Sequence, residues 1–263
     1  MNIKKHPLIY SILIAMALAV LYIMLTKTLF INTDNPFLEE TFKKLIIAIT
    51  ITILFCILRA KGSIGTPKLK QNLWKGLKDG WLFLLIGAIN LLSFSTRGAY
   101  FRPISHIICF VISIILTGIW EELLFRGIIL SLCKHNSASK NRIDNFFPVI
   151  ISALIFSLFH LLNIAPDKVT ISSVVVQMIS VFFTGIYYGA IYTRSSNILS
   201  LILLHTFQDI TALLHIGLLQ DSGDISAAIS ALSPELALAS IVFVIPAIWP
   251  VVKNKLETSN DNK

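Results

Sequence analysis

Long apolar segments follow one another along almost the whole chain, and they restrict the fold more than any other feature. Several of these eight runs reach the ~20 residues that a helix needs to cross a bilayer. Hydrophobic residues make up 55% of the 263 and charged residues 14%, which excludes an ordinary soluble domain. Because helices satisfy their own backbone hydrogen bonds in lipid, the sequence predicts an all-α, polytopic transmembrane helical bundle of about eight spanning helices. The runs are 8–30, 42–60, 80–96, 104–132, 147–164, 170–193, 197–219 and 234–252.

We expect a single membrane domain over residues 1–253, followed by a polar tail at 254–263. The first run continues well past Ala15-Met16-Ala17, so we interpret it as a retained helix and not as a cleaved signal. The run 80–96 is the weakest of the eight, because it is short and carries Asn90. A re-entrant segment is the alternative there.

The distribution of positive charge predicts the orientation. Most lysines and arginines lie in the loops on the side of the two termini, which indicates a multi-pass cell-membrane protein with both termini in the cytoplasm. The net charge of +8 does not indicate nucleic acid, since there is no basic stripe and no recognition motif; the lipid bilayer is the expected partner. Cys56, Cys109 and Cys133 form no CxxC pair, so neither a disulfide framework nor a zinc knuckle is implied.

The stretch WEELLFRG places two carboxylates and a guanidinium inside the fourth apolar run, where ionised groups are costly and rare. Glu122 and Arg126 are four residues apart and share a helix face, whereas Glu121 is turned by about 100°. We therefore expect Glu122 to pair with Arg126 and Glu121 to stay free of the arginine.

Two further expected helices carry polar groups well inside their apolar runs. The fifth run places Phe156 and His160 four residues apart, with Asn163 one turn on, and the seventh places His205 and Asp209 four apart on one face. Counted from the expected cytoplasmic ends at ~1.5 Å per residue, Glu122, His160 and His205 lie at roughly 15, 20 and 12 Å. We expect these groups to line one cavity in the cytoplasmic half of the bundle.

Each feature also has a simpler interpretation. Glu122 and Arg126 alone can be a structural ion pair, either histidine can be a hydrogen-bonding group between helices, and Phe156 can be ordinary packing. The whole set is also compatible with a proton or ion pathway. A second doublet, Glu39-Glu40, lies at an expected helix start, where the helix dipole favours acids, so we assign it no function.

Three motifs in this order resemble those of the CPBP family of intramembrane proteases, the CAAX prenyl protease and bacteriocin-processing group also called Abi. GIWEELLFRG is similar to the EExxxR motif of that family, FSLFH to FxxxH, and HTFQD to HxxxN/D. The stretch GIYYGAIYTRSSN, between the second and third motifs, also resembles the family, with Gly185, Gly189, Tyr192, Arg194 and Asn197 at positions where members commonly have such residues. The resemblance covers roughly residues 104–212, which would form the catalytic core.

The resemblance implies an intramembrane endopeptidase that hydrolyses a peptide bond of a peptide or membrane-protein substrate. Glu121 and His160 would activate a water, and His205 with Asp209 would stabilise the oxyanion. Glu122 and Arg126 would orient the first pair, with Phe156 and Asn163 in supporting positions.

Asp209 departs from the better-known prenyl-protein proteases, which have Asn there, because an ionised Asp cannot donate a hydrogen bond to an oxyanion. It is either protonated through desolvation, or fixes the His205 tautomer, or ligates a metal. The favoured mechanism needs no cofactor. The family has also been described as metal-dependent, and Glu121, His160, His205 and Asp209 are then the candidate ligands for Zn.

The resemblance also suggests a bacterial protein linked to peptide maturation or to self-immunity against bacteriocins. The alternative is a non-catalytic membrane protein of the same fold, an immunity factor or scaffold that binds a partner through the same cavity.

Overall fold

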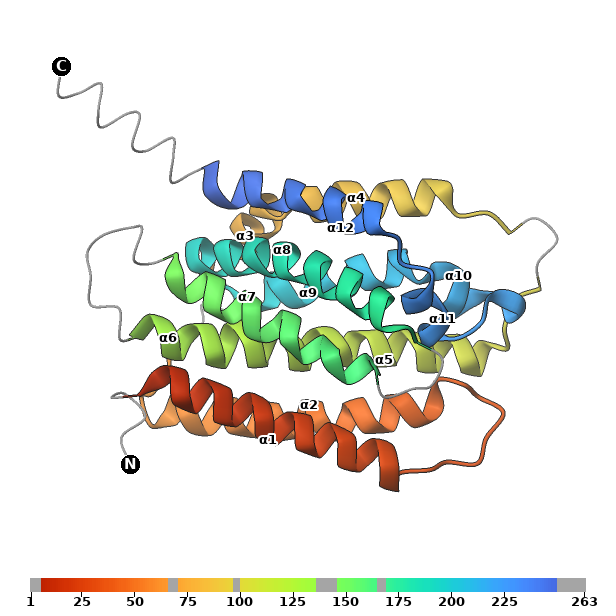
Figure 1. Cartoon of the computed structure of the whole chain (residues 1–263), viewed down its shortest axis with the longest axis horizontal. Coiled ribbons are helices and arrows are strands. Elements are labelled where there is room, and N and C mark those ends of the chain that lie inside the picture. Colours follow the sequence, from red (N-terminus) through yellow and green to blue (C-terminus); the bar gives the residue numbers. More distant parts are fainter. Residues whose placement is uncertain (1–5, 66–70, 97–99, 136–145, 165–168, 250–263) are drawn as a thin grey trace, which may run out of the picture.

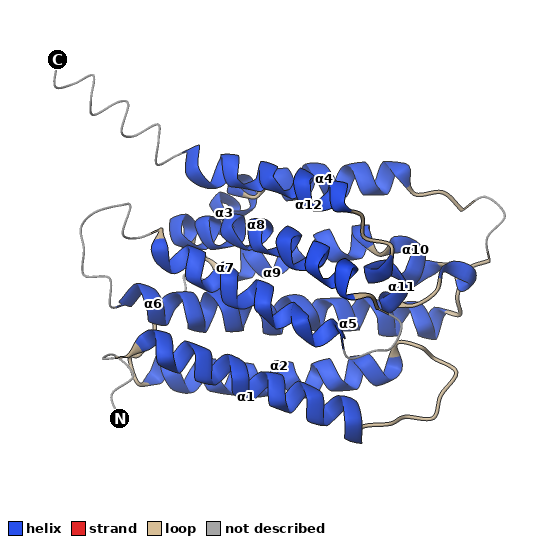
Figure 2. Ribbon diagram, viewed as in Figure 1, coloured by secondary structure: helices blue, strands red, loops and turns tan. Residues whose placement is uncertain are grey.

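The computed structural model describes residues 6–65, 71–96, 100–135, 146–164 and 169–249. Over these residues it is helical, with no strand and a single β-type bridge between Phe101 and Leu219 (Figure 2). The α-helices are α1 (Pro7–Thr28), α2 (Leu38–Ala60), α3 (Leu73–Asp79), α4 (Trp81–Ser93), α5 (Ile104–Glu122), α6 (Ser131–His135), α7 (Phe147–Phe159), α8 (Ile171–Ser195), α9 (Ile198–Ala212), α10 (Leu214–Leu218), α11 (Ile225–Ser230) and α12 (Pro234–Ser240). A π-helical segment, Leu123–Leu130, joins α5 to α6, and 3-10 turns cover His160–Ile164, Gln220–Ser222 and Ile241–Phe243.

The long helices run roughly along one direction (Figure 1). α1 and α2 lie together at one edge of the bundle, α4 and α12 lie at the opposite edge, and α5, α7, α8 and α9 fill the space between. The four helices that carry the polar motifs therefore form the middle of the bundle. This architecture confirms the predicted all-α polytopic bundle.

The number of spanning helices is smaller by length than the sequence suggested. In the described residues, five helices are long and apolar enough to cross a bilayer: Pro7–Thr28, Leu38–Ala60, Ile104–Lys134, Phe147–Ile164 and Ile171–Ser195. The bent pair α3–α4 adds a sixth if it counts as one span, and the last two apolar runs form the shorter helices Ile198–Ala212 and Pro234–Trp249. The count of eight is thus not confirmed. Residues 250–252 of the last run and the tail 254–263 lie outside the described residues.

The weak third run is one arm of a bent pair. α3 and α4 meet at an angle of 66°, and Gly80 occupies the bend between them. A Cβ added at Gly80 would lie 2.3 Å from Leu204 Cδ1, and one at Gly87 would lie 2.2 Å from the Phe207 ring. The glycines therefore let this bent pair approach α9 more closely than any other residue would allow.

A second close approach joins α5 to α9 next to the polar motifs. A Cβ added at Gly118 would lie 2.6 Å from Thr206 Oγ1 and 3.3 Å from the backbone oxygen of Ile202. Glu122 follows Gly118 by about one turn, and Thr206 adjoins His205. The glycine crossing thus brings the acidic motif of α5 and the histidine of α9 to the same level.

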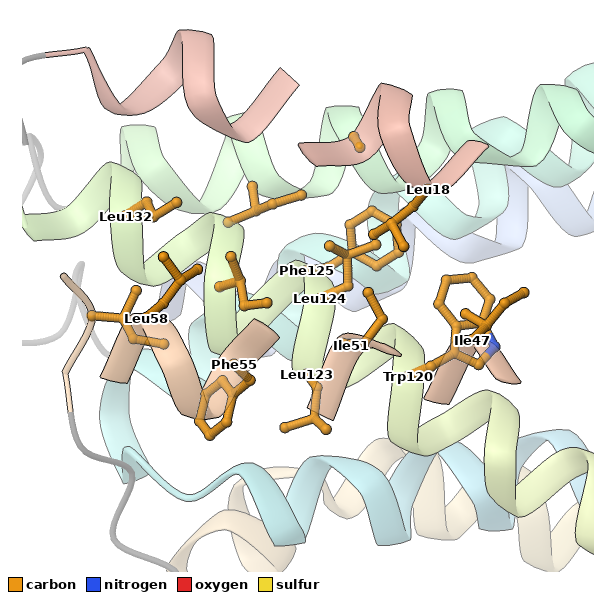
Figure 3. Close-up of a cluster of buried hydrophobic side chains, with 14 of the residues drawn as sticks. Leu18, Ile47, Ile51, Phe55, Leu58, Trp120, Leu123, Leu124, Phe125 and Leu132 are labelled. Atoms are coloured by element: carbon orange, nitrogen blue, oxygen red, sulfur yellow. The ribbon is translucent and has the colours of Figure 1, made fainter. Parts of the chain in front are cut away.

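An apolar cluster fixes α2 against α5 and the π-helical segment. Figure 3 shows Ile47 and Trp120 at one end of this cluster, and Leu58 and Leu132 at the other. Ile51 lies between them and is fully buried. The packing sets the register of α2 along α5, so side chains one turn beyond Ile47 extend past Trp120.

Replacing Gly118 by valine should destabilise the bundle, because the added methyl groups must separate α5 from α9 or displace Thr206. Overpacking of this kind costs ~1–3 kcal/mol of unfolding free energy. Titration with a denaturing detergent measures this free energy in micelles. Gly65→Ala is the matched control, since a Cβ at Gly65 meets nothing within 4 Å. Equal stability of the Gly118→Val and Gly65→Ala proteins would contradict the close crossing.

Candidate active site

The EE doublet stands where α5 changes into a π-helix. Glu121 and Glu122 are the last residues of α5, and Arg126 lies in the π-helical segment Leu123–Leu130. A π-helix has a wider turn with i to i+5 hydrogen bonds, and such segments occur frequently at functional sites. The irregular turn begins directly after the two carboxylates that the sequence singled out.

Glu122 and Arg126 form a buried ion pair. Arg126 Nη1 donates to Glu122 Oε1 at 2.8 Å, and the two side chains are 1% and 0% exposed. Arg126 Nη2 also donates to the backbone oxygen of Gly185 on α8, at 3.4 Å. The arginine therefore contacts Glu122 and not its neighbour, as the helical spacing predicted, and it ties α8 to the same point.

His205 adds α9 to this cluster. Its Nδ1 lies 2.7 Å from Glu122 Oε1, and its Nε2 lies 3.5 Å from both Glu121 Oε2 and Asp209 Oδ2. Because Glu122 Oε1 already accepts from Arg126, Nδ1–H of the imidazole is the donor in the shorter contact. One ring nitrogen is thus held by a structural carboxylate, and the other faces two further carboxylates.

This contact differs from the role that the sequence suggested for Glu122. We expected Glu122 to orient Glu121 and His160, whereas its contacts are with Arg126 and His205. The physical reason is the crossing at Gly118, which brings α9 against α5 one turn before the doublet. Helical spacing within one segment carries no information about that crossing.

His160 lies at the point where α7 ends. Its Nδ1 is 2.9 Å from the backbone oxygen of Phe156, which can only accept, so the hydrogen sits on Nδ1. In the neutral ring this leaves Nε2 with a free lone pair. The Phe156 ring packs edge-on against His160, at a centroid distance of 4.9 Å, and against His205 at 6.4 Å. Phe156 thus lies between the two histidines.

Arg126 also supports this aromatic wall. Its guanidinium carbon lies 4.7 Å from the centroid of the buried Phe156 ring. The same arginine therefore contacts the side chain that separates the histidines and the carboxylate that holds His205. A cation over an aromatic face in a desolvated site contributes roughly 2 kcal/mol.

The comparison with protein families concerns the same part of the chain. Residues 103–211 match a family described as type II CAAX prenyl endopeptidase Rce1-like. This part of the chain is similar to the CAAX protease family. No curated protein and no solved structure is matched by the chain. The Rce1-like segment includes all three motifs and nearly coincides with residues 104–212, over which the motifs extend. Together with the apolar helices, this match indicates a multi-pass membrane protein.

Asn163 lies one turn after His160, as its spacing predicted, and bonds to α8. It belongs to the 3-10 turn His160–Ile164, and its Nδ2 donates to Gln177 Oε1 of α8 at 2.8 Å. With three residues per turn, Asn163 follows His160 by one turn of this 3-10 segment. Its contact joins the end of α7 to α8.

Tyr188 of the Rce1-like segment is a site residue that the sequence analysis did not single out. Its ring stacks on His205 at 5.4 Å and on Phe83 at 4.1 Å, and the Arg126 guanidinium lies 5.1 Å from it. Tyr188 Oη, Glu122 Oε2 and Arg126 Nε are buried without a hydrogen-bond partner among the described residues. One signal was available: Tyr188 follows Gly185 by three residues and so shares its helix face.

The candidate zinc ligands are Glu121, His160, His205 and Asp209, and a zinc site requires at least three of them to converge on one point. Within the described residues, no group of three or more His, Cys, Asp or Glu side chains is placed to hold a metal ion. His205 Nδ1 is occupied by Glu122. As they are placed, Glu121, His160, His205 and Asp209 do not form such a group.

Removing the arginine of the buried pair should lower the unfolding free energy more than removing one partner of a partly exposed pair does. Arg126→Met leaves Glu122 charged in an apolar interior, which typically costs ~3–5 kcal/mol of unfolding free energy. Arg126→Met/Glu122→Gln should recover much of that loss. Asp79→Asn breaks the half-exposed pair with Arg194 Nε, 3.0 Å apart, and should cost at most ~1 kcal/mol. Equal losses for Arg126→Met and Asp79→Asn in a detergent unfolding titration would contradict a buried pair.

Proposed function

We propose that this protein is an intramembrane endopeptidase that hydrolyses a peptide bond of a membrane-associated peptide or protein with a water activated by Glu121 and His160. One observation supports this most directly: the two adjacent glutamates have separate partners. Glu122 is bound by Arg126 and His205 Nδ1, whereas Glu121 has no arginine partner and turns its carboxylate toward His205 Nε2. The doublet thus supplies one structural carboxylate and one that is available for chemistry.

In the proposed reaction, Glu121 takes a proton from the water while His160 Nε2 accepts its second hydrogen bond. The oxygen attacks the carbonyl carbon of the substrate, and the carbonyl oxygen becomes an oxyanion. When the C–N bond breaks, Glu121 returns the proton to the leaving nitrogen. Glu121 at the end of α5 and His160 at the end of α7 would hold this water through their free acceptor atoms.

His205 is the proposed donor to the oxyanion. It carries both ring protons in this mechanism, with Nδ1–H bound to Glu122 and Nε2–H directed to the developing charge. Asp209 lies beside the same Nε2 and favours the charged ring. This assignment removes the need for Asp209 to donate a hydrogen bond itself.

Replacing Glu121 by glutamine should abolish most of the cleavage, since an amide cannot take the proton from water. General-base groups contribute about 10²–10⁴-fold, so kcat should fall by that factor. The measurement uses purified protein in micelles and a library of internally quenched peptides. Glu39→Gln, from the other doublet, is the matched control and should leave cleavage unchanged. If the purified parent cleaves nothing and Glu121→Ala preserves any protective effect in cells, the protein is a non-catalytic immunity factor or scaffold.

Asp209→Asn, assayed with and without chelator, distinguishes the metal-free mechanism from a zinc-dependent hydrolase. In the metal-free site the amide keeps nearly the same shape, so much of the cleavage should remain and chelator should have no effect. Loss of parental activity on chelation with rescue by zinc, and poor rescue of Asp209→Asn, would overturn the proposed mechanism.

We further propose that both termini face the cytoplasm of a bacterial cell, from the lysine and arginine bias of the loops. A phosphatase reporter that folds only outside the membrane should be inactive when fused after Lys263. The same reporter inserted after Asp34, in the loop between α1 and α2, should be active and serves as the positive control. Activity of the Lys263 fusion would exclude this orientation.

A further inference from the structure

The α2 helix carries two adjacent lysines that face different surroundings. Lys43 is bound on its own helix, with Nζ 2.6 Å from Glu39 Oε1 and 3.0 Å from Glu40 Oε1. Lys44 has no hydrogen bond and no ion pair within 4 Å in the described part of the chain. A partly buried ammonium in an apolar bundle is costly unless a negative charge lies close to it.

The helical spacing directs Lys44 toward α5. Lys44 precedes Ile47, Ala48 and Ile51 by three, four and seven residues, so it continues the face that packs against α5. Ile47 lies at the Trp120 end of that contact (Figure 3), and Lys44 is one turn beyond it. Thr41 Oγ1 donates to the Cys109 backbone oxygen and Phe55 lies against Gly127, so α2 and α5 run in the same direction. Lys44 is therefore level with the turn of α5 that precedes Trp120.

Asp209 reaches this level from α9, which runs opposite to α5: Thr206 lies against Gly118, and Gly217, further along the chain, lies against Phe110. It stands one helical turn beyond His205, whose Nε2 is 3.5 Å from both Asp209 Oδ2 and Glu121 Oε2. The carboxylates whose charges act on Lys44 are those of Glu40, Glu121 and Asp209. Two of these three belong to the proposed active site, although Lys44 lies about 60 residues outside the segment that matches the protease family.

We propose that Lys44 is a positioning residue of this active site, whose ammonium balances the Asp209 carboxylate so that an oxyanion can form next to His205. The inference rests on the proposed peptidase function. Without Lys44, the negative charge of Asp209 would face the developing oxyanion and would compete for the His205 Nε2 hydrogen. With it, the carboxylate and the ammonium offset one another, and the imidazole remains free to donate to the substrate.

The test is a cycle of variants at Lys44 and Asp209 on the full-length protein. Lys44→Met should lower kcat by about 10–100-fold with little change in KM, as expected for an unbalanced charge a few ångströms from the reacting atoms. Lys44→Arg should retain most of the activity. Lys44→Met/Asp209→Asn should be more active than Lys44→Met alone, since the double variant no longer contains the unbalanced carboxylate.

Two controls isolate this coupling. Lys43→Met removes the neighbouring lysine and should leave kcat unchanged, because Lys43 is held by Glu39 and Glu40. Lys44→Met/Glu40→Gln removes the other carboxylate near Lys44 and should not restore kcat. Additive losses in the Lys44→Met/Asp209→Asn protein, or equal rescue by Glu40→Gln, would overturn the proposal.

A second readout does not depend on catalysis. The thermal unfolding midpoint in micelles should fall for Lys44→Met and recover for Lys44→Met/Asp209→Asn, because the charge imbalance also acts in the absence of substrate. If the parent protein cleaves no peptide, the peptidase function fails, and the unfolding cycle still decides the pairing. Additive shifts of the midpoint would then exclude a Lys44–Asp209 interaction.

Discussion

The buried charge pair of Glu122 and Arg126 is the constraint around which the middle of the bundle is arranged. An ionised side chain inside an apolar bundle is costly unless its charge is balanced by a close partner. Arg126 is matched by Glu122 and by the Gly185 carbonyl of α8, and Glu122 is matched again by His205 of α9. The three helices must therefore converge at this level, because separating any one of them would leave a charge or a strong donor unpaired.

Small residues make that convergence possible. The side chains involved reach only a few ångströms, so the helix axes have to be closer than ordinary aliphatic contacts allow. Gly118 permits this between α5 and α9, and Gly185 permits it between α7 and α8, where an added Cβ would lie 3.2 Å from both Ala153 and Phe156. Packing and electrostatics thus support each other: the glycines bring the helices together, and the polar contacts select one register.

The sequence predicted what depends on a single helix and missed what depends on a crossing. Apolar runs predicted the helical bundle, and the four-residue spacing predicted the contact of Arg126 with Glu122, which the structure contains. The contact of Glu122 with His205, the stacking of Tyr188 and the bend at Gly80 arise from how separate helices meet, which periodicity does not encode. The bond of Asn163 to Gln177 is likewise a contact between helices. The helix count differs because apolar length alone does not reveal where a run breaks.

The charge balance of the site explains why a doublet of glutamates is useful at this position. Adjacent residues on a helix point about 100° apart, so only Glu122 contacts Arg126, and the two carboxylates meet different nitrogens of His205. Glu121, Glu122 and Asp209 contribute three negative charges, and Arg126 with the proposed Lys44 contributes two positive ones. A proton on His205 then brings the local sum to zero, which a low-dielectric interior favours over any net charge. When Glu121 takes a proton from water, the transferred negative charge moves to the oxyanion within the same cluster, so the sum does not change during the proposed reaction. A single glutamate would have to hold the histidine and accept the proton at once, and its protonation would release the imidazole at the step where the oxyanion needs it.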